Sequence, residues 1–208
     1  MSTLALFFIV SLASTAMPGP AILYVCTQGM SGGLRAGLPA AAGVLCADAL
    51  YIVLSVTGLS AVLAASYELF TLMKWAGAVY LCYLGLRLIF SAIGQTSPAT
   101  PAGAPIAARR SLLGGFVLHA ANPKALLYFG SLVPQFVDPA RPLPSQLVTL
   151  AAIHLSTAAV VLIAYAAVSA RLRYSAANAG ANRIFKVAAG SSMVGAGVSM
   201  ALLRKGTE

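Results

Sequence analysis

The stretch LLGGFVLHAANPKALLYFGSLV, residues 112–133, is a long apolar run that is interrupted in its middle. A helix of about 20 residues crosses the roughly 30 Å hydrocarbon core of a bilayer, and this run is long enough. Pro123 has no N–H to give to the carbonyl of His119, so it breaks the helix. Lys124 lies about 10 residues from either end of the run, which is roughly 15 Å of depth. The stretch therefore predicts a broken membrane-spanning helix beside a deeply placed charge.

Five further apolar runs resemble this one in length, at residues 4–25, 37–63, 69–90, 147–168 and 187–203. The chain of 208 residues is 60% hydrophobic and only 8% charged, against about 25% charged in ordinary soluble domains. A soluble protein could not cover its surface with so few charges, whereas a protein surrounded by lipid needs few. We therefore predict an all-α membrane protein with six transmembrane helices.

Basic residues are distributed unevenly over the connections between these six spans. The first, third and fifth connections and their flanks hold Arg35, Arg87, Arg109, Arg110, Arg171, Arg173, Arg183 and Lys186. The other side has only Lys74, Arg141, Arg204 and Lys205. Because positive connections stay in the cytoplasm, we expect both termini on the periplasmic or extracellular side. The net charge of +9 is thus a topology signal, and we expect no nucleic-acid partner.

The chain divides into two similar halves within one transmembrane domain of residues 1–208. Residues 91–111 are rich in Pro, Ala, Gly and Thr, and predict a flexible linker between residues 1–90 and 112–208. Pro18-Gly19-Pro20 in the first run matches Asn122-Pro123-Lys124 in the fourth. Since three spans per half is an odd number, the halves run in opposite directions. We predict two inverted three-helix repeats with broken helices one and four, a plan common among secondary transporters.

The break at Pro18-Gly19-Pro20 predicts a binding position for an anion. The two prolines take helical hydrogen bonds away from the carbonyls of Ser14 and Ala16. Irregular backbone at membrane depth is tolerated only where protein or water covers it, so the break should face the interior. Pro20 suits the first turn of a new half-helix, whose start carries partial positive charge. A carboxylate is expected there, and the alternative is a simple proline kink.

Lys124 and Asp48 are the two most deeply placed charges. Lys124, in the Asn122-Pro123-Lys124 break, is expected to pair with Asp48 or with a substrate carboxylate. The alternative is a lysine near the end of a short half-helix. Asp48 lies about 11 residues into the second run. It pairs with Lys124, binds a substrate ammonium group, carries a coupling proton or makes structural hydrogen bonds.

Three further polar residues in the apolar runs are secondary candidates: His119, His154 and Tyr24. Each histidine titrates near neutral pH when its surroundings leave it unperturbed, and the simpler interpretation is an interior histidine with satisfied hydrogen bonds. Tyr24 follows the first break at the distance at which Tyr128 follows the second. Tyrosines of this kind are more often packing residues.

The sequence also resembles the lysine exporter (LysE/RhtB) family of amino-acid efflux proteins. The matching segments are Pro18-Gly19-Pro20, GGLRAG at 32–37 leading to Asp48, LMKWAGAVYLCYLG at 72–85, Asn122-Pro123-Lys124-Ala125 and PQFV at 134–137. The resemblance implies a secondary transporter of the bacterial inner membrane that exports amino acids such as threonine, homoserine, leucine or lysine. It implies coupling to an ion gradient, with protons as the expected ion, and neither ATP, an enzymatic activity nor a cofactor. The expected partners are an amino acid, protons and the lipid bilayer, and a homodimer is an open possibility.

A divalent metal-cation exporter of similar architecture is the alternative prediction. Cation pathways usually offer more oxygen or thiolate ligands than one deep acid, and Lys124 repels cations, so we expect no metal site. A membrane thiol–disulfide carrier would need paired cysteines, but Cys26, Cys46 and Cys82 belong to different parts of the chain. A membrane hydrolase would need a nucleophile beside a base, and no motif indicates one.

Overall fold

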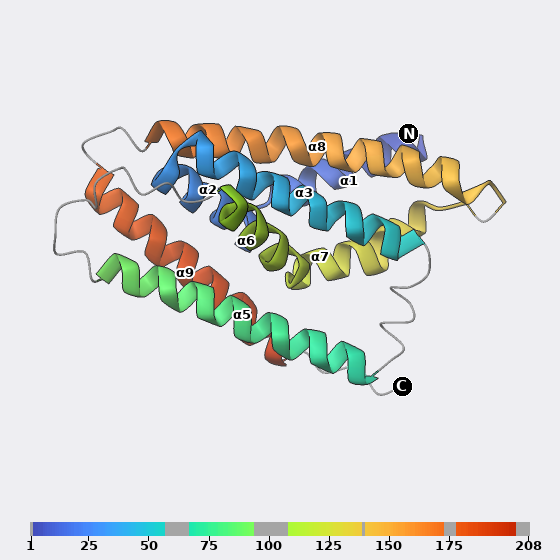
Figure 1. Cartoon of the computed structure of the whole chain (residues 1–208). Helices are drawn as coiled ribbons and strands as arrows, with labels where there is room; N and C mark the ends of the chain where they lie inside the picture. The colour runs from blue at the N-terminus through green and yellow to red at the C-terminus, as the bar shows by residue number, and fades with distance from the viewer. Residues whose placement is uncertain (1, 57–66, 94–107, 139, 173–177, 203–208) are drawn as a thin grey trace.

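A computed structural model describes residues 2–56, 67–93, 108–138, 140–172 and 178–202 of this chain (Figure 1). In chain order they form α1 (Thr3–Ala16), α2 (Pro20–Gly32), α3 (Leu34–Val56), α5 (Tyr67–Ile93), α6 (Ala108–Ala120), α7 (Pro123–Leu127), the π-helix η1 (Tyr128–Leu132), the 3-10 helix η2 (Val133–Phe136), α8 (Leu143–Leu172) and α9 (Asn178–Leu202). None of the described residues is in a strand. The prediction of an all-α protein is confirmed.

Two of the described helices are long and apolar enough to cross a membrane by themselves, Leu34–Ser55 of α3 and Leu143–Leu172 of α8. Taken together as one broken span, α1 and α2 are also long and apolar enough to cross a membrane. This span is bent by 55° at the residues between the two helices. These helices support a membrane protein. The finer arrangement of six spans stays a prediction, and residues 57–63 of the second predicted run lie outside the described part of the chain.

Helices extend into both ends of the predicted linker at residues 91–111, so its predicted bounds are wrong there. Helix α5 extends to Ile93, and α6 already begins at Ala108. Alanine and arginine are good helix formers, and no proline follows Pro105 before the next break, so the helix starts at Ala108. Residues 94–107, the rest of the predicted linker, lie outside the described residues.

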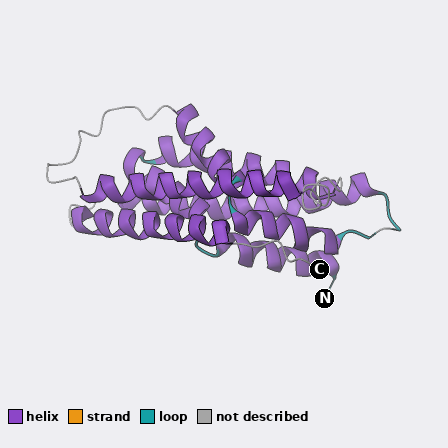
Figure 2. Ribbon diagram, turned by 90° about the horizontal axis from the view of Figure 1, so that it is seen from below, coloured by secondary structure: helices purple, strands orange, loops and turns teal. Residues whose placement is uncertain are grey.

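The helices lie along a broadly common direction, and α5 and α9 are side by side (Figures 1 and 2). This pair crosses at two glycines. A Cβ atom on Gly85 would lie 2.5 Å from the carbonyl oxygen of Gly190, and one on Gly190 would lie 2.6 Å from that of Gly85. Small residues at a crossing let helix backbones approach closely, as is usual between membrane helices.

Large apolar side chains cover the outside of the helices. Large apolar side chains more than half exposed occur on four helices: Trp75, Val79, Tyr83, Phe90, Ile93, Leu127, Val148, Val160, Val168, Ile184 and Leu202. Lipid is as apolar as these side chains, so burying them against other helices gives little stabilisation in a membrane. This surface fits a protein whose outside faces hydrocarbon.

The interior holds two groups of buried apolar side chains. One includes Val25, Val44 and Leu162 from α2, α3 and α8. The other includes Phe7, Tyr128 and Phe129 from α1 and η1. Members of both groups line one cavity, so the cavity lies where the two groups meet.

Candidate functional site

The first break separates α1 from α2 at the predicted position. Helix α1 ends at Ala16 and α2 begins at Pro20, with Gly19 in an extended conformation before it. The carbonyl of Ser14 accepts a hydrogen bond from Lys124 Nζ at 2.5 Å. The carbonyl of Ala16 accepts one from the hydroxyl of Tyr165 at 3.2 Å. These are the two carbonyls that Pro18 and Pro20 leave without a helical N–H, so side chains of the second half replace the missing bonds.

The second break separates α6 from α7. Helix α6 ends at Ala120, whose carbonyl accepts a hydrogen bond from the hydroxyl of Tyr51 at 2.6 Å. Asn122 caps α7, because its side-chain oxygen accepts from the backbone N–H of Lys124 at 3.0 Å. The carbonyl of His119 cannot accept a hydrogen bond from Pro123, which has no N–H. It accepts one from the N–H of Asn122 at 3.0 Å. Asn122 therefore positions Lys124 by starting the helix that carries it.

Lys124 joins the two breaks. Its Nζ donates to the carbonyl of Ser14 and, at 3.1 Å, to that of Met17. Within the described part of the chain no ion pair includes Lys124. The predicted alternative that Lys124 pairs with Asp48 is therefore wrong. The prolines of the first break leave backbone carbonyls without a helical donor, and Lys124 binds such carbonyls in place of Asp48. The sequence pattern did not reveal that these carbonyls compete with Asp48 for Lys124.

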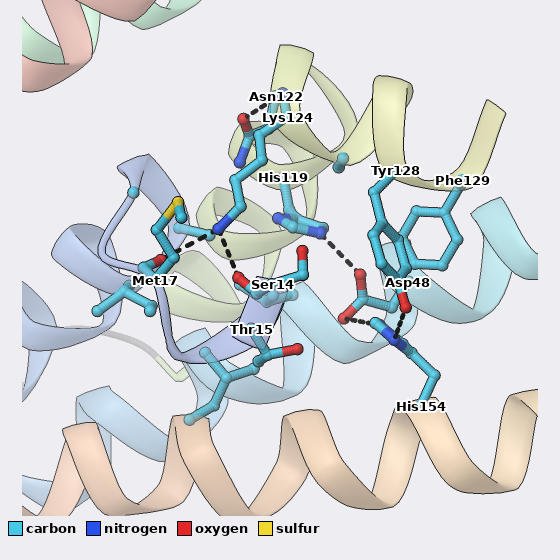
Figure 3. Close-up of a pocket in the computed structure, with 16 residues that line it drawn as sticks. Ser14, Thr15, Met17, Asp48, His119, Asn122, Lys124, Tyr128, Phe129 and His154 are labelled. Carbon is cyan, nitrogen blue, oxygen red and sulfur yellow. Dashed lines mark hydrogen bonds and ion pairs between the residues drawn. The ribbon is translucent and has the colours of Figure 1, made fainter. Parts of the chain in front are cut away.

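Asp48 instead contacts both histidines of the interior (Figure 3). The Nε2 atom of His119, on α6, lies 2.7 Å from its Oδ1. The Nε2 atom of His154, on α8, lies 3.6 Å from its Oδ2. Sequence reasoning ranked these histidines as secondary. One signal favoured His154, because it follows Tyr128 by almost the same distance as Asp48 follows Tyr24.

A chain of hydrogen bonds continues from His154 into α1. His154 Nδ1 lies 3.2 Å from the hydroxyl of Tyr128, which lies 2.7 Å from Ser11 Oγ. Ser11 is fully buried. Sequence reasoning missed Ser11, because a serine on an apolar helix has no signal of its own.

These groups surround a cavity of about 480 Å³, counting its open mouth. Its polar lining includes Asp48, His119 and Lys124, and its apolar lining includes Ile22, Val44, Ala125, Phe129 and Leu162. A mostly apolar lining with a few placed polar groups is typical of small-molecule sites. In Figure 3 the ring of His119 lies between Lys124 and Asp48 in the view.

The remaining predicted site residues lie near the cavity or apart from it. Gly19 and Asn122 are among its lining residues. Pro18, Pro20 and Pro123 are at the two breaks, where they shape the backbone. Tyr24 lies elsewhere, and its hydroxyl donates to the carbonyl of Ser111 at 3.3 Å. The structure thus brings Asp48, His119, Lys124 and His154 together and leaves Tyr24 outside.

The alternative predictions depend on metal-ligating side chains or on paired cysteines. Among the described residues, no group of three or more His, Cys, Asp or Glu side chains is arranged to hold a metal ion. Cys26, Cys46 and Cys82 are free thiols on α2, α3 and α5.

This chain is similar to a known protein family and to several known proteins. The family model for LysE type translocators matches residues 12–204. A leucine efflux protein of Enterobacter sp. (strain 638) is 36% identical over 125 residues, which cover 59% of this chain and 57% of that protein. The corresponding protein of Klebsiella pneumoniae is 33% identical over the same shares. An uncharacterized membrane protein of Vibrio cholerae is 32% identical over 74% of this chain and 75% of its own.

The aligned part of this chain spans less than two thirds of the leucine efflux proteins. No solved structure matches the chain.

Proposed function

This chain belongs to the LysE type translocator family, and we propose that it exports leucine or a similar aliphatic amino acid from a bacterial cell by proton antiport. The family and the apolar helices make it a membrane transporter and not an enzyme. We further propose that it resides in the inner membrane with both termini outside. The six proposed spans form two inverted repeats.

The observation that carries this proposal is the pair of opposite charges in one cavity. Lys124 and Asp48 both line the cavity, yet each is bonded to other groups and not to its opposite. A zwitterionic amino acid has a carboxylate and an ammonium group on one carbon. It complements such a site, with its carboxylate toward Lys124 and its ammonium group toward the hydrogen-bonded pair of His119 and Asp48.

The start of α2 supports the carboxylate end of this arrangement. Gly19, Ala21 and Ile22 line the cavity, and no side chain caps the helix. The first N–H groups of a helix have no partner inside the helix and carry its partial positive charge. They add to the attraction that Lys124 provides for a carboxylate.

The apolar wall supports an aliphatic side chain. Ile22, Val44 and Leu162 are buried aliphatic residues on three different helices, and all line the cavity. Burying a leucine-sized side chain in such surroundings contributes about 1.5–3 kcal/mol. The relatives named as leucine efflux proteins agree with this class of substrate.

The way the two breaks are closed supports the inverted repeat. Ala16 ends α1 and accepts a hydrogen bond from Tyr165 on α8. Ala120 ends α6 and accepts one from Tyr51 on α3. Ala16 and Ala120 precede the Pro-Gly-Pro and Asn-Pro-Lys motifs by the same distance. Each half therefore closes the broken helix of the other by the same kind of contact.

Efflux from whole cells tests the function. Cells with and without the protein are preloaded with a panel of labelled amino acids, and their loss is followed before and after the proton gradient is collapsed. We expect faster, gradient-dependent loss of leucine and its aliphatic neighbours. If no amino acid leaves faster although the protein is present in the membrane, the proposed function is wrong.

A further inference from the structure

We propose, on the basis of the amino-acid export proposed above, that the substrate's ammonium group and the coupling proton compete for Nδ1 of His119. While one of them occupies this atom, the other cannot bind there. This assigns a binding and coupling role to one atom of the cavity. It also explains how a single site exchanges one proton for one amino acid.

The hydrogen bond between His119 and Asp48 determines what Nδ1 can do. An ionised carboxylate only accepts hydrogen bonds, so the Nε2 atom at 2.7 Å from Asp48 Oδ1 carries the hydrogen. In a neutral imidazole the other nitrogen then has a lone pair and acts as an acceptor. Nδ1 of His119 is buried, and it has no hydrogen-bond partner among the described residues.

Asp48 itself is less suited to contact a substrate. Its carboxylate is 3% exposed, and its two oxygens face His119 and His154. His119 is among the cavity-lining residues, and its hydrogen bond to Asp48 couples its other ring nitrogen, Nδ1, to that charge. In Figure 3 this unbonded nitrogen is on the side of the ring away from Asp48.

His154 cannot take the same role, although it contacts the same carboxylate. Its Nδ1 is already within 3.2 Å of the Tyr128 hydroxyl. Of the two histidines, only His119 presents an acceptor that no described side chain occupies. The two residues therefore differ in the property that the proposal needs and form a matched pair for its test.

Protonation would change Nδ1 from a hydrogen-bond acceptor into an N–H donor. The ring would then be a cation, which Asp48 stabilises and which repels an ammonium group. The other titratable groups that line the cavity are Asp48 from α3, His154 from α8, Lys124 from α7 and Tyr128 from η1. Tyr51 of α3 lies near His119 in the chain fold, because its hydroxyl donates to the carbonyl of the adjacent Ala120. The cavity-lining residues of α1 and α2 include no titratable side chain.

The exchange balances in charge and protons. On the cytoplasmic side, the proton leaves Nδ1 for water as the ammonium group of the substrate arrives with its own hydrogens. On the outer side, a proton from water binds Nδ1 as the substrate leaves. Each cycle moves one zwitterion outward and one positive charge inward, so both the pH gradient and the membrane potential drive export.

The first test uses the unaltered protein, purified and reconstituted into liposomes. Exchange of internal unlabelled for external labelled leucine is measured at equal pH on both sides, from pH 7.5 to 5.5. We expect the half-saturating leucine concentration to rise, approaching about tenfold per pH unit once protons occupy the site. Inhibition by 4-methylpentanoate, which has the carboxylate and side chain but no ammonium group, should not weaken at acid pH.

The second test compares His119→Gln with His154→Gln. His119→Gln keeps a hydrogen-bonding side chain but cannot titrate. Because it alters the binding position itself, we expect slower leucine exchange, with a half-saturating leucine concentration that changes less than about twofold with pH. Accumulation driven by an imposed pH gradient should be lost. His154→Gln should exchange leucine more slowly but keep the pH effect and the gradient-driven accumulation.

The outcomes separate this inference from the proposed function. If the unaltered protein exchanges no amino acid at any pH, the export function is wrong and the inference fails with it. If it exchanges leucine with no pH effect, or if His119→Gln retains gradient-driven accumulation, the export function stands and the inference is overturned. Loss of the pH effect in His154→Gln alone would also overturn it.

Discussion

The ammonium group of Lys124 lies 2.5 Å from the carbonyl oxygen of Ser14, across the boundary between the two halves of the chain. The lysine is at the second break and the carbonyl is at the end of the helix before the first. One contact therefore joins the two irregular segments and brings a positive charge to the cavity. Its consequences for transport can be measured.

Replacing Lys124 by Gln should weaken leucine transport by about 10- to 100-fold, because a charge-assisted hydrogen bond contributes about 1.5–3 kcal/mol. The effect should be smaller for leucinamide, which has no carboxylate to bind. Competition with labelled leucine in liposomes measures how strongly unlabelled leucine and leucinamide each bind. Lys186→Gln, a half-buried lysine of α9 outside the cavity lining, is the matched control. Equal losses for leucine and leucinamide would contradict carboxylate binding by Lys124.

Replacing Asp48 by Asn should abolish gradient-driven transport while the protein still reaches the membrane. The amide cannot stabilise a protonated histidine, and it leaves His119 and His154 without their shared anion. Asp138→Asn, which removes an exposed carboxylate paired with Arg141, is the control. Proton-driven leucine accumulation at matched membrane abundance measures the effect. Intact accumulation in Asp48→Asn would show that coupling does not depend on this carboxylate.

Enlarging the apolar wall should change which amino acid is exported. Val44→Phe places a larger side chain in the cavity, so leucine transport should fall at least about tenfold while alanine transport falls less. Val53→Phe, on the exposed side of the same helix, should leave the preference unchanged. Competition between labelled leucine and alanine gives the ratio. An unchanged ratio in Val44→Phe would mean that the substrate side chain lies elsewhere.

The glycine crossing of α5 and α9 should be sensitive to a single methyl group. Gly85→Ala forces an atom toward the Gly190 carbonyl, and overpacking of this kind costs about 1–3 kcal/mol. We expect a lower melting temperature in detergent, followed by tryptophan fluorescence. Gly195→Ala, whose added Cβ would meet nothing within 4 Å, should melt like the unaltered protein. Equal melting of both variants would contradict this crossing.

The two tyrosines that close the broken helices should have similar effects on stability. Tyr165→Phe and Tyr51→Phe each leave a helix-end carbonyl without its side-chain donor, at a cost of about 1 kcal/mol. Tyr83→Phe, whose side chain is largely exposed, is the control. Thermal unfolding of the three variants compares them. A marked loss for one tyrosine only would weaken the argument for equivalent halves.

The helical fold and the positions of its breaks could be predicted because they are local properties. Apolar runs of membrane length predict helices wherever they occur, and a proline removes a backbone donor whatever surrounds it. The breaks at Pro18-Gly19-Pro20 and Asn122-Pro123-Lys124 were therefore located correctly. The membrane depth of Lys124 and Asp48, which was counted along the same runs, stays a prediction.

The partners of those charges could not be predicted, because they depend on which helices meet. Charge alone pointed Lys124 toward Asp48, but carbonyls freed at a distant break lie closer to it. Asp48 instead meets two histidines contributed by α6 and α8. Ser11, which ends the chain of contacts from His154, had no sequence signal at all.

The sequence by itself determined that this chain is a helical membrane protein with two interrupted helices, because hydrophobic length and missing backbone donors act within one segment. Only the tertiary structure decided that Asp48, His119 and Lys124 line one cavity and that one nitrogen of His119 is left without a described partner. A hydrogen bond acts over about 3 Å, and helices far apart in the chain must pack before such distances exist.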